Sequence, residues 1–349
     1  MTQRRRIRMA VAAVVAVALV AVVLGGALVP GGTAPASAAD PVVLTVTGNG
    51  VTKTFTMAEL QGLPVYDGYS GIINSANTVT APKPIKGVKL SDIFAEVGGI
   101  TQSQSVDVLA SDDYGMTFTY AEVATGSFQM YSSSTKEAED ARAPVSLVLI
   151  YQYDGAPLGA APDGDGPLRL AVSQPTDVGQ VAEGHLNVKW VNRLTLRGAV
   201  ADWKVKMTGL KQKNGKRQTY TLDRKTYDSC ATPGCHGAAW TQPATQKTWT
   251  GVPLFLCIGK IDGGKGHGGY GAYNEPLALK GYRIKITSAT GGSVIIASRT
   301  IMNKERIILA NKLMGSELTA PYYPLRLVGP SIGTGRFIGR ITKIQLLPK

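Results

Sequence analysis

The chain has 349 residues, a length that predicts more than one domain. Its three cysteines exclude a disulfide-rich scaffold, and its formal charge of +13 favours an anionic partner over a cationic one.

Residues 1–39 have the pattern of an export signal. A basic start is followed by an uncharged apolar stretch over residues 9–29 and by small residues over 36–39. Cleavage there would leave a mature chain that begins near Asp40. An uncleaved anchor is the alternative, because the apolar stretch approaches the ~20 residues that span a bilayer. Either form places the rest of the chain outside the cytoplasm, secreted or at the cell surface, since the basic residues stay inside.

The basic start, Arg4-Arg5-Arg6-Ile7, fits a twin-arginine signal as well as an ordinary one. The twin-arginine route would suit a protein that is exported already folded around a cofactor. Without the four arginines of the leader the net charge is +9. For an exported protein, this charge predicts a small anionic substrate and no nucleic-acid partner.

The first half of the mature chain alternates strand and turn signals. β-Branched alternation around Asn49-Gly50 predicts a hairpin over residues 44–56. Apolar residues at helical spacing over 90–97, followed by Gly98-Gly99, predict a short helix. Further strands are expected over residues 106–110, 145–151, 168–172 and 188–196.

The second half of the mature chain also alternates strand and turn signals. Basic residues crowd the segment 204–225, which we interpret as a solvated hairpin that turns at Asn214-Gly215 rather than as a binding patch. Strands are expected over residues 282–287, 293–301, 325–328 and 341–347. Because helices are few and short, the pattern favours an α+β, β-rich fold with mixed or antiparallel sheets.

Five short landmarks occur twice, in the same order, at separations of 150 to 165 residues. Two of the pairs are Lys86-Gly87-Val88-Lys89-Leu90 with Thr250-Gly251-Val252-Pro253-Leu254, and Pro167-Leu168-Arg169-Leu170 with Pro324-Leu325-Arg326-Leu327. The repetition predicts a tandem repeat of one domain, over residues 42–198 and 203–348.

The order of these motifs resembles the oxidoreductase molybdopterin-binding domain of the sulfite oxidase type. The resemblance rests on a Cys-bearing loop at Cys235, the Trp249-Thr250-Gly251-Val252-Pro253-Leu254 run, the two Pro-Leu-Arg-Leu runs, and the Lys189-Trp190 pair before a strand. It implies two tandem sulfite-oxidase-like domains that bind molybdenum-molybdopterin.

The resemblance also implies site residues. Cys235 would be the catalytic thiolate ligand of the metal, since a thiolate suits molybdenum. Basic groups would hold the pterin phosphate. These cofactor-binding candidates are His185, Lys189, Arg169, Arg326 and His236. Electrons would pass to an external partner, because the sequence shows no second redox centre.

The two copies depart from the family in different ways. In the first copy Tyr69 stands where we align Cys235 of the second. The second copy lacks the Lys-Trp pair. The copies therefore either share one site, or the scaffold serves another purpose.

Several candidates have an alternative explanation. Cys230 and Cys235 either pair as a local disulfide, leave Cys235 as a cofactor thiolate, or attach haem, although their spacing is two residues too long for the haem motif. We expect Cys257 to be a core residue. His236 either joins the cofactor or hydrogen-bonds its own loop. Arg169 and Arg326 bind either an anion or a structural acid.

Two functions follow. The first is an exported molybdopterin-dependent oxidoreductase-like enzyme that acts on a small oxyanion or an S/N-oxide. The second is a cofactor-free cell-surface module that binds a ligand or a protein through an aromatic rim. We predict this rim from Tyr69, Tyr270, Tyr273 and Trp240, beside a glycine-rich loop that contains His267.

Overall fold

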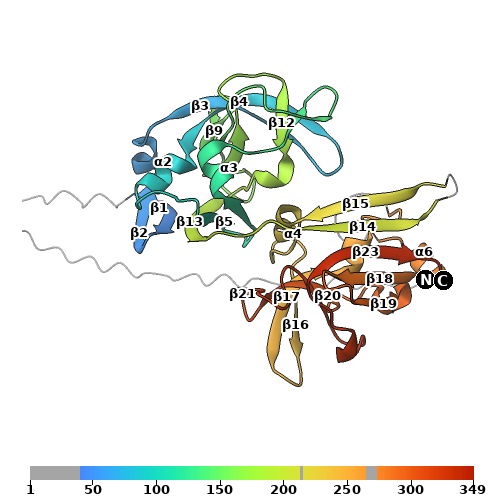
Figure 1. The fold of residues 1–349 in the computed structure, drawn as a ribbon. Coiled ribbons are helices and arrows are strands. Elements are labelled where there is room, and N and C mark those ends of the chain that lie inside the picture. Colours follow the sequence, from blue (N-terminus) through green and yellow to red (C-terminus); the bar gives the residue numbers. More distant parts are fainter. Residues whose placement is uncertain (1–39, 213–214, 265–272) are drawn as a thin grey trace, which may run out of the picture. The chain divides into compact units, whose positions relative to one another are not determined.

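The computed structural model describes residues 40–349 apart from 213–214 and 265–272 (Figure 1). Asp40–Lys349 form one compact unit. The predicted export signal, and the turn residue Asn214, lie outside the described residues. In the part of the chain that is described, no helix is long and apolar enough to cross a membrane.

A five-stranded sheet opens the first half. It has the order β2-β1-β13-β5-β6, with β1 parallel to β13 and every other pair antiparallel. Asn49 and Gly50, both at positive φ, make the predicted turn between β1 and β2. The strands are β1 (Val42–Gly48), β2 (Val51–Thr56), β5 (Gln104–Ala110), β6 (Gly115–Thr119) and β13 (Val191–Gly198).

A larger sheet completes the first half. Its order is β10-β9-β4-β3-β12-β7-β8, and β11 pairs with β9. The strands are β3 (Tyr66–Ile73), β4 (Val79–Lys89), β7 (Met130–Ser132), β8 (Ala138–Glu139), β9 (Ser146–Tyr153), β10 (Ala156–Pro157), β11 (Arg169–Ser173) and β12 (Gln180–Glu183).

The second half contains two sheets of the same plan. One has the order β15-β14-β23-β18-β19, again with a single parallel pair, β14 with β23. The other has the order β16-β17-β20-β21, with β22 on β20. The strands are β14 (Lys204–Lys211), β15 (Arg217–Asp223), β16 (Ala238–Gln242), β17 (Lys247–Pro253), β18 (Arg283–Ser288), β19 (Ser293–Ala297), β20 (Ile308–Leu313), β21 (Ser316–Glu317), β22 (Arg326–Val328) and β23 (Ile341–Leu347).

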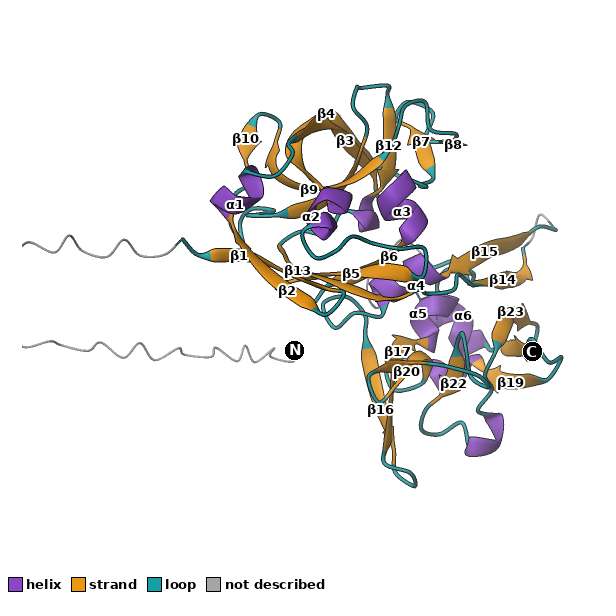
Figure 2. Cartoon of the chain, turned by 60° about the vertical axis from the view of Figure 1, so that its left-hand side comes forward, coloured by secondary structure: helices purple, strands orange, loops and turns teal. Residues whose placement is uncertain are grey.

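Short helices fill the space beside these sheets. In the first half α1, α2 and α3 lie between the two sheets (Figure 2). The predicted apolar positions of α2 are all buried, because they form the face that packs into this core. The helices are α1 (Met57–Gln61), α2 (Leu90–Ala95), α3 (Tyr120–Thr125), α4 (Arg224–Cys230), α5 (Leu254–Ile258), α6 (Glu275–Lys280) and α7 (Ser298–Ile301), with the 3₁₀ turns η1 (Gly184–Leu186) and η3 (Thr334–Arg336).

The predicted α+β class, with mixed and antiparallel sheets and few short helices, is confirmed. Two local predictions were wrong. Residues 298–301 form helix α7 instead of continuing a strand. Arg224 and Lys225, assigned to a solvated hairpin, begin helix α4 and are enclosed.

Strand register corrects one alignment between the halves. Gly87 pairs with Tyr66, and its counterpart Gly251 pairs with Ala238. Counting back from these pairs places Leu63, and not Tyr69, at the position of Cys235. The sequence alignment was wrong by six residues because the segments before β3 and β16 contain no shared landmark. Tyr69 lies within β3, opposite Pro84.

Candidate functional site

The cysteine loop begins where helix α4 ends. Asp223 caps the start of this helix through the backbone N–H of Thr226, at 2.8 Å. After Cys230 the chain folds back on itself, and the N–H of His236 donates to the carbonyl of Cys230 at 3.0 Å. This turn brings the Cys235 thiol into a hydrogen bond with the Cys230 sulfur. Neither cysteine forms a disulfide in the structure.

The titrations of the two thiols are coupled. The hydrogen bond from Cys235 lowers the pKa of Cys230 to about 7; burial opposes this effect, and the positive charge of Lys260 supports it. The same hydrogen bond, burial and the negative charge on Cys230 raise the pKa of Cys235. The pair therefore loses its first proton easily and its second with difficulty.

The first half of the chain also reaches this loop. Gly234 packs against the turn between β5 and β6, and a Cβ on it would lie 2.8 Å from the carbonyl oxygen of Asp112. Tyr114, from the same turn, donates its hydroxyl to the carbonyl of His185 at 3.2 Å. Burial and the nearby cysteines raise the pKa of Tyr114, so the phenol stays protonated.

His185 lies on the 3₁₀ turn η1, near the cysteine loop. Its Nε2 is 3.5 Å from the Glu183 carboxylate, and this nitrogen is buried without a hydrogen-bond partner. Burial lowers the pKa of His185, while the charges of Glu183 and Asp223 oppose the shift. Glu183 accepts a hydrogen bond from Tyr131 at 2.7 Å. The pKa shift of His185 therefore favours the neutral ring, and its side chain is partly buried.

Asp165 holds two of the predicted phosphate ligands. Its carboxylate lies 2.9 Å from Nη1 of Arg169 and 2.7 Å from Nζ of Lys189. The Arg169 guanidinium also stacks on the ring of Tyr153, 5.3 Å from its centroid. One carboxylate thus contacts both cations and offsets one of the two positive charges. Arg169 has the acid partner that its structural explanation predicts, while its Nε is buried without a hydrogen-bond partner.

Replacing Asp165 by Asn should lower the free energy of unfolding by about 2 kcal/mol, because Arg169 is 8% exposed and would lose its charged partner. Replacing Lys189 by Met should change it by less than about 1 kcal/mol, since that side chain is 53% exposed. Urea unfolding measures both. Equal effects of the two variants would contradict the assignment of Asp165 as a structural partner of Arg169.

Arg326 is enclosed by aromatic rings instead of by an acid. Its guanidinium carbon lies 3.8 Å from the centroid of Tyr322 and 4.8 Å from that of Trp249. Its Nε is buried without a hydrogen-bond partner. This stacking stabilises the cation without bringing it to either cysteine.

Cys235 and His236 line a cavity of about 230 Å³. The other lining residues are Gly237, Ala238, Pro253, Phe255, Leu256 and Glu305, and this set contains no lysine or arginine. A molybdopterin would need a thiolate at Cys235 and cations for its phosphate. Because the wall carries the Glu305 carboxylate and neither lysine nor arginine, the residues present do not fit the phosphate of that cofactor.

The predicted aromatic rim does not assemble. Tyr273 is 4% exposed and Trp240 is 8% exposed, so both are core residues. Tyr270 and His267 lie outside the described residues. Cys257 is buried in α5, as predicted. Across the described ranges, 40–212, 215–264 and 273–349, no group of three or more His, Cys, Asp or Glu residues is arranged to hold a metal ion.

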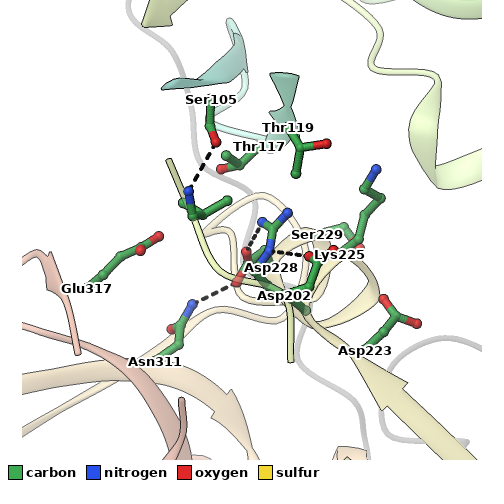
Figure 3. A network of polar contacts seen from close by, with 12 residues as sticks. Ser105, Thr117, Thr119, Asp202, Asp223, Lys225, Asp228, Ser229, Asn311 and Glu317 are labelled. Atoms are coloured by element: carbon green, nitrogen blue, oxygen red, sulfur yellow. Dashed lines mark hydrogen bonds and ion pairs between the residues drawn. The ribbon is translucent and has the colours of Figure 1, made fainter. Parts of the chain in front are cut away.

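A second group of polar residues links the two halves at helix α4. Arg224 lies between two acids that Figure 3 labels, with its Nε 3.1 Å from Asp202 and its Nη1 3.0 Å from Asp228. Asn311 donates to the other oxygen of Asp228 at 3.1 Å. Lys225, one residue on, contacts the carboxylate of Glu122 and the ring of Phe118 from the first half.

Beside this network is a cleft of about 340 Å³, which we call the junction cleft. Its walls come from β5, β6 and β13 on one side and from α4, the loop after it, β20 and β21 on the other. Sequence analysis missed the junction cleft, since its residues are distributed over more than 200 positions and form no motif. The lining includes Asp107, Leu109, Asp113, Met116, Thr117, Arg193, Thr195, Arg197, Asp228, Pro233, Asn311, Lys312 and Glu317.

Comparisons with known proteins find similarity among solved structures but not among sequences. No protein-family model matches the sequence, and no curated protein matches it. Among solved structures, the sulfane dehydrogenase SoxCD from Paracoccus pantotrophus is similar, with a TM-score of 0.33 and 15% identity. The likeness covers 72% of this chain and 58% of that chain. A likeness at this level assigns no activity.

Proposed function

We propose that the chain is an exported, cofactor-free module that binds a small organic anion, built on two tandem sulfite-oxidase-like domains over residues 42–198 and 203–348. The equivalent strand orders of the two halves support the tandem scaffold. So does the register, because Val46 pairs with Leu194 as Met207 pairs with Ile344. The export signal supports a location outside the cytoplasm.

One observation carries the choice between the two predicted functions. Asp165 pairs with both Arg169 and Lys189, so a pterin phosphate would have to compete with this carboxylate for them. In a molybdopterin-dependent oxidoreductase these residues would bind an anionic cofactor. Here they stabilise the loop that precedes β11.

The junction cleft is where we place the ligand. Its volume of about 340 Å³ lies within the range of small-molecule sites, roughly 300–1,000 Å³. Three of its acids already have cationic partners: Arg197 binds Asp107 and Glu317, and Arg224 binds Asp228. The fourth acid, Asp113, has no ion pair among the described residues, so the lining itself carries four carboxylates and three cations.

Two cations remain at the edge of the junction cleft. Arg193 and Lys312 are exposed, and no ion pair joins either of them to an acid among the described residues. Leu109, Met116 and Pro233 add apolar atoms to the lining. A carboxylate attached to a small apolar group matches this combination of charge and apolar wall.

Benzoate and benzylamine test this chemistry, because they share a ring and differ in charge. Benzoate should bind, and benzylamine should not. Replacing both Arg193 and Lys312 by Ser should weaken benzoate binding at least ~10-fold, since each charge-assisted hydrogen bond contributes on the order of 1.5 kcal/mol. Isothermal titration or NMR chemical shifts measure the affinities. Lys247→Ser is the matched control, because Lys247 is exposed and lies outside the junction cleft.

Equal binding of the two probes, or unchanged benzoate affinity in the double variant, would refute the anion site. The cofactor has a separate test. Protein purified from its native host should contain no molybdenum and yield no pterin fluorescence after oxidation. One molybdenum per chain that disappears in Cys235→Ser would instead establish the oxidoreductase with an external electron partner.

A further inference from the structure

The contact between Cys230 and Cys235 is a chemical feature that an anion-binding module does not use. Both side chains are partly exposed, and an interaction between the two sulfurs shifts the pKa values of both. Backbone hydrogen bonds hold the loop in this turn: the N–H groups of Cys235 and Gly237 donate to the carbonyl of Thr232, at 3.0 and 2.9 Å. Two thiols held in contact can become a disulfide with little movement of the backbone.

We propose that Cys230 and Cys235 form a reversible dithiol–disulfide couple that exchanges with a disulfide on another molecule. Cys235 is the sulfur that meets the incoming disulfide, and Cys230 is the sulfur that completes the exchange. Cys257, the remaining cysteine, is buried in α5 and takes no part.

The shape of the site supports the order of the two sulfurs. Cys235 lines the cavity of about 230 Å³, whereas Cys230 does not. The cavity wall is mainly apolar, through Pro253, Phe255 and Leu256, so it favours a disulfide that is flanked by apolar groups. An incoming molecule therefore reaches Cys235 first.

The charges around the pair support thiolate chemistry. The thiolate, and not the thiol, attacks a disulfide. Once the pair has lost a proton, the remaining S–H stabilises the negative sulfur, and Lys260 adds a positive charge near Cys230. The remaining proton can move between the two sulfurs along their hydrogen bond, which places the negative charge on Cys235.

The exchange balances in two steps. The Cys235 thiolate attacks one sulfur of the incoming disulfide, forms a mixed disulfide and releases one thiolate. The Cys230 thiol then loses its proton to solvent and attacks the Cys235 sulfur, which releases the second thiolate. The protein loses two electrons and becomes a Cys230–Cys235 disulfide, and the incoming disulfide gains two electrons and becomes two thiols.

The aromatic disulfide 5,5′-dithiobis(2-nitrobenzoate) tests the proposal on the full mature chain without denaturant. Reduced wild-type protein should release two thionitrobenzoate anions per chain and retain no adduct. Intact mass should fall by two hydrogens, and peptide mapping should place the disulfide between Cys230 and Cys235. Retention of one or two adducts on the wild type would overturn the proposal, and so would a reaction that requires denaturant.

Single variants test the order of attack. Cys230→Ser should release one anion and keep one adduct on Cys235, because the second step lacks its sulfur. Cys235→Ser should react about 10-fold more slowly, since the sulfur in the cavity is missing. Cys257→Ser should behave like the wild type. Faster labelling of Cys230 in Cys235→Ser than of Cys235 in Cys230→Ser would reverse the assigned order and refute that part of the proposal. Circular dichroism of each variant establishes that it is folded, and the wild-type mass result does not depend on any variant.

Discussion

Replacing Arg224 by Met should lower the free energy of unfolding by about 3–5 kcal/mol. The Arg224 side chain is 4% exposed, and its loss would leave Asp228, which is 17% exposed, without the charge that compensates it. An uncompensated buried carboxylate costs far more than the net value of the original pair. Equilibrium unfolding in urea measures the change. Asp202→Asn is the control with a small effect, since Asp202 is 75% exposed.

The effect of Arg224→Met should also depend on pH. Burial already raises the pKa of Asp228, and Arg224 opposes the rise. A carboxyl whose pKa is raised on folding contributes stability at low pH that is lost as the pH rises through the folded-state pKa. Without Arg224 the pKa rises further, so the deficit should be largest at pH 7 and shrink toward pH 4. A deficit that stays constant over this range would argue against a buried charge as its cause.

A methyl group at Gly251 should cost about 3 kcal/mol, through overpacking of a central strand pair. A Cβ there would lie 2.1 Å from the Leu309 carbonyl oxygen and 2.8 Å from the Tyr227 hydroxyl. Tyr227 donates to that same carbonyl and accepts from the N–H of Val252 at 2.9 Å. Gly251→Ala would therefore separate β17 from β20 and disturb a buried hydroxyl. Thermal and urea unfolding measure the loss.

The equivalent substitution in the first half, at Gly87, tests the same effect independently. Its Cβ would lie 2.3 Å from the Leu149 carbonyl oxygen, so Gly87→Ala should have a similar effect on the first half. Gly198→Ala is the matched control, because nothing lies within 4 Å of a Cβ at that position and the change should stay within about 0.5 kcal/mol. If Gly251→Ala is as stable as Gly198→Ala, close strand approach is not the reason for glycine in this motif.

Local sequence patterns predicted the elements whose cause is local. Asn49-Gly50 fixed the first hairpin, because both positions need positive φ. The apolar spacing in residues 90–97 located α2, since one face of that helix enters the core. The strand prediction for residues 298–301 was wrong because the alternating pattern before them continues to their start. In the structure these residues form helix α7, where the buried hydroxyl of Ser298 donates to the carbonyl of Ala278 at 2.9 Å.

The candidate site was predictable only in part. The sequence located Cys230 and Cys235 in one loop but left a disulfide, a metal ligand and haem attachment open, because the choice depends on what surrounds the sulfurs. Asp165 and Arg169 are four residues apart, yet their pairing required the structure, since Lys189 joins the same carboxylate. The junction cleft could not be predicted, because its lining residues are far apart in the sequence and follow no regular spacing.

The parallel strand pairs have a consequence for how the chain reaches its native state. In each half the strand that pairs with the opening hairpin is also the last of the sheet to be synthesised: β13 lies between β1 and β5, and β23 lies between β14 and β18. Thr45 must find Arg193 across roughly 150 intervening residues, a contact with a large loop-closure cost. Until then the β1–β2 ribbon presents an unsatisfied edge to its surroundings. Each half is therefore expected to complete its sheet only after its closing strand has been synthesised.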